Sequence, residues 1–253
     1  MSSERPDQQE PSAGSQAVKV STPAVKPMVT FALIIFTFLI YALQLASEYI
    51  TGYDWLFIYG GKINEVILAG EVWRLITPVF LHSSIPHIVF NMYALYILGR
   101  RSESVYGHAR FTLLYFLSAF GGNVLSFVLS PSPSLGSSTA IFGLLAAEGV
   151  FIFQNRRLFG KRTKSMLSNI IMVLFLNLAI GFSPSLNIDY FGHLGGLLAG
   201  FLFASLSGPK LVVEGLPPNL ILKDSRSKGE IRNAVVFVTI GFVIMSLIPL
   251  IFS

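Results

Sequence analysis

Seven separate apolar runs constrain this chain more than any other feature of its sequence. Most of them approach the ~20 residues that a helix needs to cross the ~30 Å hydrocarbon core of a bilayer. Only 12% of the residues are charged, whereas about a quarter are charged in an ordinary soluble domain. The sequence therefore predicts an all-α polytopic membrane protein. The expected transmembrane helices lie at roughly 28–46, 84–99, 111–130, 138–153, 166–182, 188–207 and 234–252.

The basic residues predict how the chain is oriented. Sixteen of the 18 Lys and Arg fall in segments that one side of the membrane would share, which leaves only Lys62 and Arg74 on the other side. Because cytoplasmic loops carry the excess of Lys and Arg, the N-terminus is expected in the cytoplasm and Ser253 outside. The same grouping accounts for the net charge of +5 without a nucleic-acid partner, and none is expected.

The expected domain organisation follows from composition along the chain. Residues 1–27 are polar, with no apolar signal region, and predict a disordered cytoplasmic tail. Residues 28–207 form the expected six-helix core, 208–233 a cytoplasmic linker and 234–253 an added seventh transmembrane helix. The chain has no cysteine, which excludes a disulfide framework, a thiolate metal site and a cysteine nucleophile.

Polar residues gather at one expected depth of this bundle. In the predicted topology the second, fourth and sixth helices all enter from outside, so their first residues lie at the same level. His87 and Asn91 share one face of the second helix, Ser138 begins the fourth and His193 lies near the start of the sixth. Polar groups inside a membrane are costly and mark functional sites. A serine and a histidine at matched depth predict a catalytic pair.

Peptide-bond hydrolysis needs a nucleophile, a base, donors for the oxyanion, and water. We expect Ser138 to be the nucleophile and His193 the base, with His87 and Asn91 donating to the oxyanion. Phe142, one turn beyond Ser138, is expected to stack on the imidazole. The fourth helix, with 16 residues from Ser138 to Phe153, is only ~24 Å long. Its outer end should therefore lie below the membrane surface, under a water-filled dip.

The fourth and sixth helices carry the small residues that close packing requires. These residues recur at a spacing of four, which lets two helix backbones approach in a membrane. They are Gly143 and Ala147 on the fourth helix and Gly192, Gly196 and Gly200 on the sixth. The spacing predicts that Ser138 and His193 are neighbours.

The residues in these positions resemble the rhomboid intramembrane serine proteases over about 73–200. The matching residues are Trp73-Arg74, Thr77, His82, His87, Asn91, the Gly136-x-Ser138 box and Gly192-His193. The resemblance implies a six-helix rhomboid-like bundle, here with an added helix. It also implies a Ser138–His193 dyad without a third acid and an oxyanion site that includes the Ser138 backbone.

The resemblance further implies how the remaining matched residues act. Trp73, Arg74 and His82 would be structural, and Glu103 with Gly99 and Gly107 would shape the turn after the second helix. The expected function is an intramembrane serine endopeptidase, without cofactor or metal. It would cut transmembrane protein substrates near the outer membrane face through an acyl-enzyme.

Three residues leave a choice of roles. The commonest family box has Gly after the nucleophile, and Thr139 fits that place only if it is helical. Asp189 is expected to cap the sixth helix, the alternative being the acid of a triad. Glu148, deep in the fourth helix, is expected to play a structural part, pairing with the Arg156 cluster or with Asn169 or Asn177, and not to relay protons.

Three other functions compete with the protease. A catalytically dead relative that escorts membrane clients is supported only by Thr139. A transporter is compatible with Glu148 but not with the missing internal repeats. A metalloprotease is weakest, because the four histidines form no H-E-x-x-H pair.

Overall fold

Helices dominate the computed structural model, which describes residues 20–21, 25–181, 188–216 and 220–252. The long helices are α1 (Met28–Thr51), α6 (His108–Leu129), α7 (Ser138–Gln154), α9 (Arg162–Gly181), α10 (Tyr190–Ser207) and α11 (Lys228–Ser246). The shorter ones are α2 (Trp55–Gly60), α3 (Asn64–Leu68), η1 (Val72–Leu75), η2 (Thr77–Phe80), α4 (Ile85–Ala94), the π-helical turn η3 (Leu95–Gly99), α5 (Arg100–Tyr106), α8 (Arg156–Phe159) and α12 (Ile248–Phe252).

Four of these helices are long and apolar enough to span a membrane, namely α1, α6, α10 and α11, and α7 is a shorter apolar helix. Each of the seven predicted apolar runs contains helix in the described residues. The predicted run at 84–99 corresponds to α4 and η3, which α5 continues beyond it, and the run at 166–182 corresponds to α9. The prediction of a polytopic helical membrane fold is confirmed to this extent, while the count of seven spans stays a prediction.

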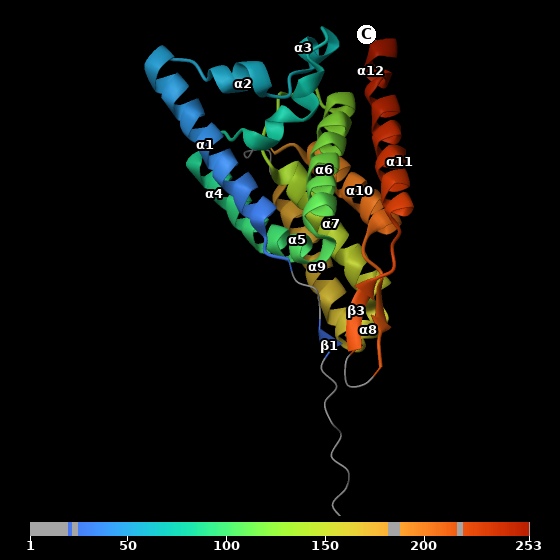
Figure 1. Ribbon diagram of the computed structural model, residues 1–253. Helices are drawn as coiled ribbons and strands as arrows, with labels where there is room; N and C mark the ends of the chain where they lie inside the picture. The colour runs from blue at the N-terminus through green and yellow to red at the C-terminus, as the bar shows by residue number, and fades with distance from the viewer. Residues whose placement is uncertain (1–19, 22–24, 182–187, 217–219, 253) are drawn as a thin grey trace, which may run out of the picture.

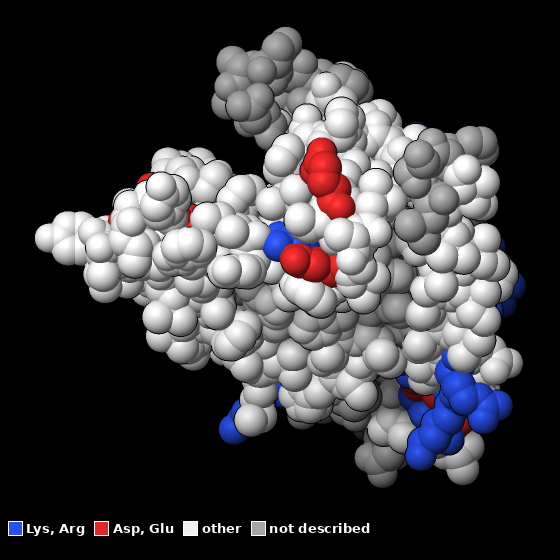
Figure 2. Space-filling view, turned by 90° about the horizontal axis from the view of Figure 1, so that it is seen from above, with Lys and Arg blue, Asp and Glu red and all other residues white. Residues whose placement is uncertain are grey.

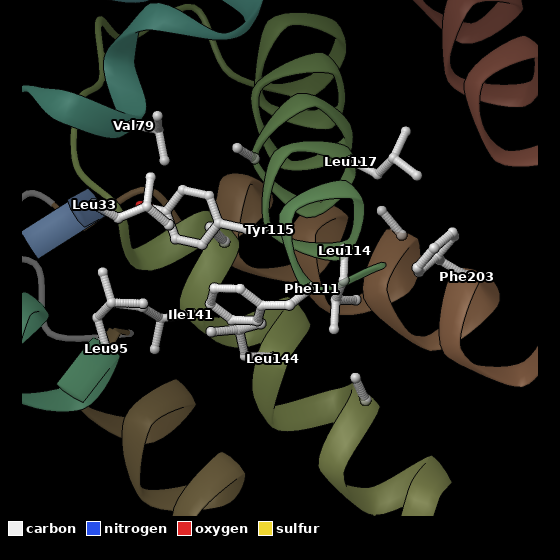
Figure 3. Close-up of a cluster of buried hydrophobic side chains, with 14 of the residues drawn as sticks. Leu33, Val79, Leu95, Phe111, Leu114, Tyr115, Leu117, Ile141, Leu144 and Phe203 are labelled. Carbon is white, nitrogen blue, oxygen red and sulfur yellow. The ribbon is translucent and has the colours of Figure 1, made fainter. Parts of the chain in front are cut away.

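The core lies where α6, α7 and α10 pack against one another, with α11 alongside α6 and α10. Figure 3 shows its largest cluster, in which Phe111, Leu114 and Tyr115 of α6 meet Ile141 and Leu144 of α7. Helices α1 and η3 reach the same cluster through Leu33 and Leu95. Apolar and small residues make up most of α7, as expected for a helix buried in a membrane protein.

The segment between α1 and α4 forms a separate layer at one end of the bundle. Helices α2 and α3 lie there across the ends of the long helices, at the same end as the C-terminal helix α12 (Figure 1). Figure 2 looks onto this end and shows a surface made mostly of uncharged side chains, with only a few acidic and basic groups. This segment therefore has a defined, partly helical structure.

A small sheet lies at the opposite end of the molecule (Figure 1). Strand β3 (Leu220–Asp224) pairs antiparallel with β2 (Leu211–Glu214) and parallel with β1 (Val20–Ser21), in the order β1-β3-β2. The sheet was not predicted, and it joins the expected N-terminal tail to the expected linker on one side. Most of the tail 1–27 lies outside the described residues.

The seventh helix begins earlier than predicted. Helix α11 starts at Lys228 instead of residue 234, because Ser227 and Glu230 form a capping box that satisfies its first N–H groups. Phe242 of this helix is buried and packs against Gly121 of α6. The expected linker is correspondingly shortened, and its strands β2 and β3 form a hairpin.

Two carboxylates inside the bundle have partners that the sequence did not identify. Glu148 pairs with Arg101 at 2.5 Å, so the prediction of Arg156, Asn169 or Asn177 as its partner was wrong. Glu103 accepts hydrogen bonds from the Val29 and Thr30 backbone N–H groups and thereby caps the start of α1. Nδ1 of His108 lies 2.6 Å from Oε1 of the same carboxylate.

Candidate active site

The Ser138 hydroxyl and the His193 imidazole are in direct contact. Ser138 is the first residue of α7, and its Oγ lies 2.8 Å from Nε2 of His193 on α10. His193 is only 8% exposed, so the pair is largely shielded by protein. A hydroxyl bonded to an imidazole nitrogen at this distance is the geometry that lets a base remove the proton of a nucleophile.

Glycine packing between α7 and α10 brings the two side chains together. A Cβ on Gly196 would collide with the backbone of Thr139, and a Cβ on Gly200 would collide with the backbone of Gly143. The two helix backbones therefore touch directly, as the small residues at a spacing of four predicted. Because neither helix can move closer, this contact sets the distance between the first turns that carry Ser138 and His193.

Phe142 packs on one face of the His193 imidazole, and Asp189 caps the helix that carries it. The Phe142 ring stacks on it with centroids 4.2 Å apart and planes at 17°, which is the predicted arrangement. Asp189 caps α10 through a hydrogen bond of 2.8 Å from the Gly192 N–H to its Oδ1, and its prediction as a cap is confirmed. Among the described residues, the buried Nδ1 of His193 has no hydrogen-bond partner.

His87 and Asn91 converge beside the start of α7. A Cβ on Gly136 would lie 2.9 Å from both Cε1 and Nε2 of His87 and 3.8 Å from Nδ2 of Asn91. Gly136 adopts a φ of +125°, a conformation that other residues avoid, so glycine is needed there both for the backbone and for the space. The side chains that the sequence grouped as oxyanion donors thus meet two residues before Ser138.

His87 has a second contact that bears on its proton. Its Nδ1 lies 3.1 Å from the Ser83 hydroxyl, on the side of the ring away from Gly136. If that hydroxyl donates to Nδ1, the proton of the neutral ring is on Nε2, which faces Gly136. His87 can then donate a hydrogen bond toward the space beside Ser138.

The neighbouring serine has a different environment. Ser137 is fully buried, and its Oγ lies 3.4 Å from Nε2 of His82. It occupies the N-cap position of α7 but makes no side-chain capping hydrogen bond. Burial, together with the nearby His87, lowers the pKa of His82 to about 3, which leaves this imidazole neutral at neutral pH.

Thr139 is helical, which removes the conflict expected at this position. It is the second residue of α7, with its side chain buried against Gly122 of α6 and Gly192 of α10. A β-branched residue is compatible with this backbone. The departure from the commonest box therefore imposes no strained turn after Ser138.

The segment between α1 and α4 is held together by side chains that donate to backbone carbonyls. Arg74 is 2% exposed and donates to the carbonyl oxygens of Ile58 and Gly61, and Trp73 donates to that of Tyr59. These bonds fit the structural role implied for both residues. Lys62, which the sequence treated only as one of two outer cations, is also buried and bonds to the segment before Ser138.

Within the part of the chain that the structure describes, no group of three His, Cys, Asp or Glu side chains is arranged to hold a metal ion. The four histidines fall into two groups. His82, His87 and His193 lie around the start of α7, while His108 lies beside Glu103 on the α5–α6 turn.

Comparison with known proteins gives a consistent assignment. Residues 69–210 match the Rhomboid domain. The chain is 41% identical over 180 residues to Rhomboid protease GluP of Bacillus subtilis (strain 168), covering 68% of this chain and 35% of the relative. It is 38% identical over 141 residues to RHOMBOID-like protein 1 of Arabidopsis thaliana, covering 55% and 36%. With Rhomboid-like protease 3 of Toxoplasma gondii it shares 38% over 149 residues, covering 57% and 55%.

The chain spans about a third of the length of the first two of these relatives. The matched region contains the whole constellation around Ser138 and His193 as well as the glycines that pack α7 against α10. This chain belongs to the rhomboid family, and it is an integral membrane protein that crosses the bilayer more than once.

Proposed function

We propose that the chain is an intramembrane serine endopeptidase that cuts transmembrane protein substrates through a Ser138–His193 dyad. The contact of 2.8 Å between Oγ of Ser138 and Nε2 of His193 carries this proposal. The bacterial and Toxoplasma relatives, Rhomboid protease GluP and Rhomboid-like protease 3, are both named as proteases, which supports it. The absence of a hydrogen bond to Nδ1 of His193 in the described residues is compatible with a dyad that uses no third acid.

Acylation begins when Oγ of Ser138 attacks the carbonyl carbon of the scissile bond while Nε2 of His193 takes its proton. The carbonyl oxygen becomes an oxyanion. His87, Asn91 and the Ser138 backbone N–H at the start of α7 donate to it, and the unpaired N–H groups of that helix end favour the negative charge. The C–N bond then breaks, and the leaving amine receives the proton from His193.

Deacylation repeats these steps with water as the nucleophile. His193 takes a proton from a water molecule, which attacks the ester carbon of the acyl-enzyme. The ester C–O bond breaks, and Ser138 regains a proton from His193. The acid product leaves, and the enzyme returns to its starting protonation state.

The length of α7 supports access of water from one side. Its 17 residues extend roughly 26 Å, less than the ~30 Å hydrocarbon core. With Arg156 and Arg157 at the inner surface, Ser138 is recessed from the outer surface, where a water-filled dip can form. We therefore propose cleavage near the outer face, an N-terminus in the cytoplasm and a C-terminus outside, as the distribution of Lys and Arg favours.

Adjacent serines provide a matched test. A fluorophosphonate probe should label the purified wild type, and Ser138→Ala should lose that label while Ser137→Ala keeps it. His193→Ala should also lose it, because an unactivated serine is a weak nucleophile. Label that persists in Ser138→Ala but disappears in Ser137→Ala would contradict the assignment.

A further inference from the structure

Lys62 is a buried cation in the segment between α2 and α3, outside the candidate membrane spans. Its side chain has no exposed surface, although buried lysines are rare unless they are paired. Its backbone forms an isolated antiparallel bridge with Ser134, with both N–H···O distances at 3.0 Å. Lys62 therefore contacts the connection between α6 and α7, which leads directly into Ser138.

The ammonium group binds that same connection. Its Nζ donates to the carbonyl oxygens of Ser130 at 2.8 Å and Ser132 at 3.0 Å. Asn64 adds bonds from Nδ2 to the carbonyls of Phe127 and Ser130. The side chains of Lys62 and Asn64 thus hold one side of residues 130–134. Among the described residues, the direct partners of the ammonium group are carbonyl groups and not carboxylates.

The charge of Lys62 also interacts with Asp189, at the start of the helix that carries His193. Burial lowers the pKa of Lys62 to about 8, and the negative charges of Asp189 and Glu65 oppose that change. Asp189 caps α10, the helix that carries His193. Oδ2 of Asp189 is buried and has no hydrogen-bond partner among the described residues, so the nearby ammonium is favourable for it.

We propose that Lys62 is a positioning residue that holds residues 130–137 and thereby keeps the Ser138 hydroxyl in reach of His193. This inference rests on the proposed function. Downstream of the bridge, Gly136 donates its N–H to the Pro78 carbonyl and faces His87 and Asn91, so a shift of the connection would displace Ser138 and its oxyanion donors together. A displacement of about 1 Å in a reacting group can cost about 100-fold in rate.

Substitution of Lys62 by Met tests the ammonium while keeping most of the side-chain volume. In Lys62→Met the Ser132 carbonyl loses its donor and the Ser130 carbonyl keeps only its bond from Asn64, so the rate of fluorophosphonate labelling should fall about 10- to 100-fold. Lys223→Met is the matched control, because Lys223 is exposed and pairs with Glu214 on the β2–β3 hairpin. Its labelling rate should stay within about twofold of the wild type.

A disulfide tests whether a link between residues 62 and 134 is enough to restore the site. Lys62 and Ser134 exchange both backbone hydrogen bonds, an arrangement with Cα atoms about 5.5 Å apart, which suits a disulfide. The chain has no other cysteine, so Lys62→Cys with Ser134→Cys introduces the only two thiols. The reduced double variant should label as slowly as Lys62→Met, and oxidation should restore most of the wild-type rate. Failure of oxidation to restore labelling, once the disulfide is verified by mass spectrometry, would overturn the positioning role.

Amide hydrogen exchange tests the positioning role of Lys62 separately from the proposed protease activity. Lys62→Met should speed exchange at the Ser134 and Gly136 amides, which are bonded to Lys62 and Pro78, without affecting α11. A labelled wild type together with Lys62→Met at the wild-type labelling rate would overturn the positioning role alone. A wild type that no serine probe labels would overturn the proposed function, and the positioning role with it.

Discussion

Substitution of Gly136 by Ala tests how the site is assembled, because it acts on the backbone and on His87 at once. Gly136 has a φ of +125°. A methyl group there would lie 2.9 Å from two atoms of the His87 ring, closer than real Cβ contacts occur. The ring must therefore turn away, or the connection carrying Ser138 must move.

The two effects have different sizes. Forcing a residue with a side chain into this region of φ costs on the order of 1–3 kcal/mol of folding free energy. Loss of one oxyanion donor lowers the rate by about 100- to 1,000-fold, or about 3–4 kcal/mol of barrier. Gly136→Ala should therefore show a moderate loss of stability together with a large loss of labelling rate.

Gly70→Ala is the matched control for backbone strain. Gly70 has a φ of +107°, but a Cβ there meets nothing within 4 Å. Both variants should be compared by thermal unfolding and by the rate of fluorophosphonate labelling. The control should lose stability by a similar amount and label at close to the wild-type rate.

Two results would refute this reasoning. If Gly136→Ala unfolds as easily as Gly70→Ala but labels like the wild type, His87 is not an oxyanion donor. If both variants lose labelling equally, strain alone accounts for the effect. A double variant with His87→Ala should label no more slowly than either single variant, since both substitutions remove the same donor.

Two further predictions concern the first turns of α10 and α7. Asp189→Ala should lower the free energy of unfolding by about 1 kcal/mol through loss of the cap, while Asp189→Asn keeps a capping oxygen and should label like the wild type. A fall of about 10,000-fold in the labelling rate of the Asn variant would instead indicate a triad acid. Thr139→Gly, despite matching the commonest family box, should lower the unfolding temperature, because it removes a buried side chain packed on Gly122 and Gly192 and weakens the helix by about 1 kcal/mol. A labelling rate above that of the wild type would mean that Thr139 restricts the site.

Local patterns predicted the parts of the fold that depend on one element at a time. Hydropathy located the start of α7 at Ser138, and the offset of three residues between Asp189 and Gly192 is that of a helix cap. The small residues at a spacing of four predicted the contact of α7 with α10, since only small side chains allow two backbones to touch. These features brought Ser138, His193 and Phe142 into one hypothesis.

Features that depend on how separate segments are placed were not predictable in the same way. Glu148 pairs with Arg101 because of how α5 and α7 are rotated about their axes, which no local spacing encodes. The burial of Lys62 depends on the segment between α1 and α4 folding back over the α6–α7 connection. The signal available for Lys62 was its position as one of only two Lys or Arg residues between residues 47 and 83.

Ser137 and Ser138 are chemically identical neighbours that lie in different surroundings. Successive residues at a helix start point in directions about 100° apart, and here Ser137 meets His82 whereas Ser138 meets His193. Because the two hydroxyl groups are chemically identical, only their position along the chain decides which of them contacts His193. Inserting a single residue between the Lys62–Ser134 bridge and α7 would place Ser137 where Ser138 lies, and deleting one would place Ser138 where Ser137 lies. The length of this short connection is therefore under as strict a constraint as the serine itself.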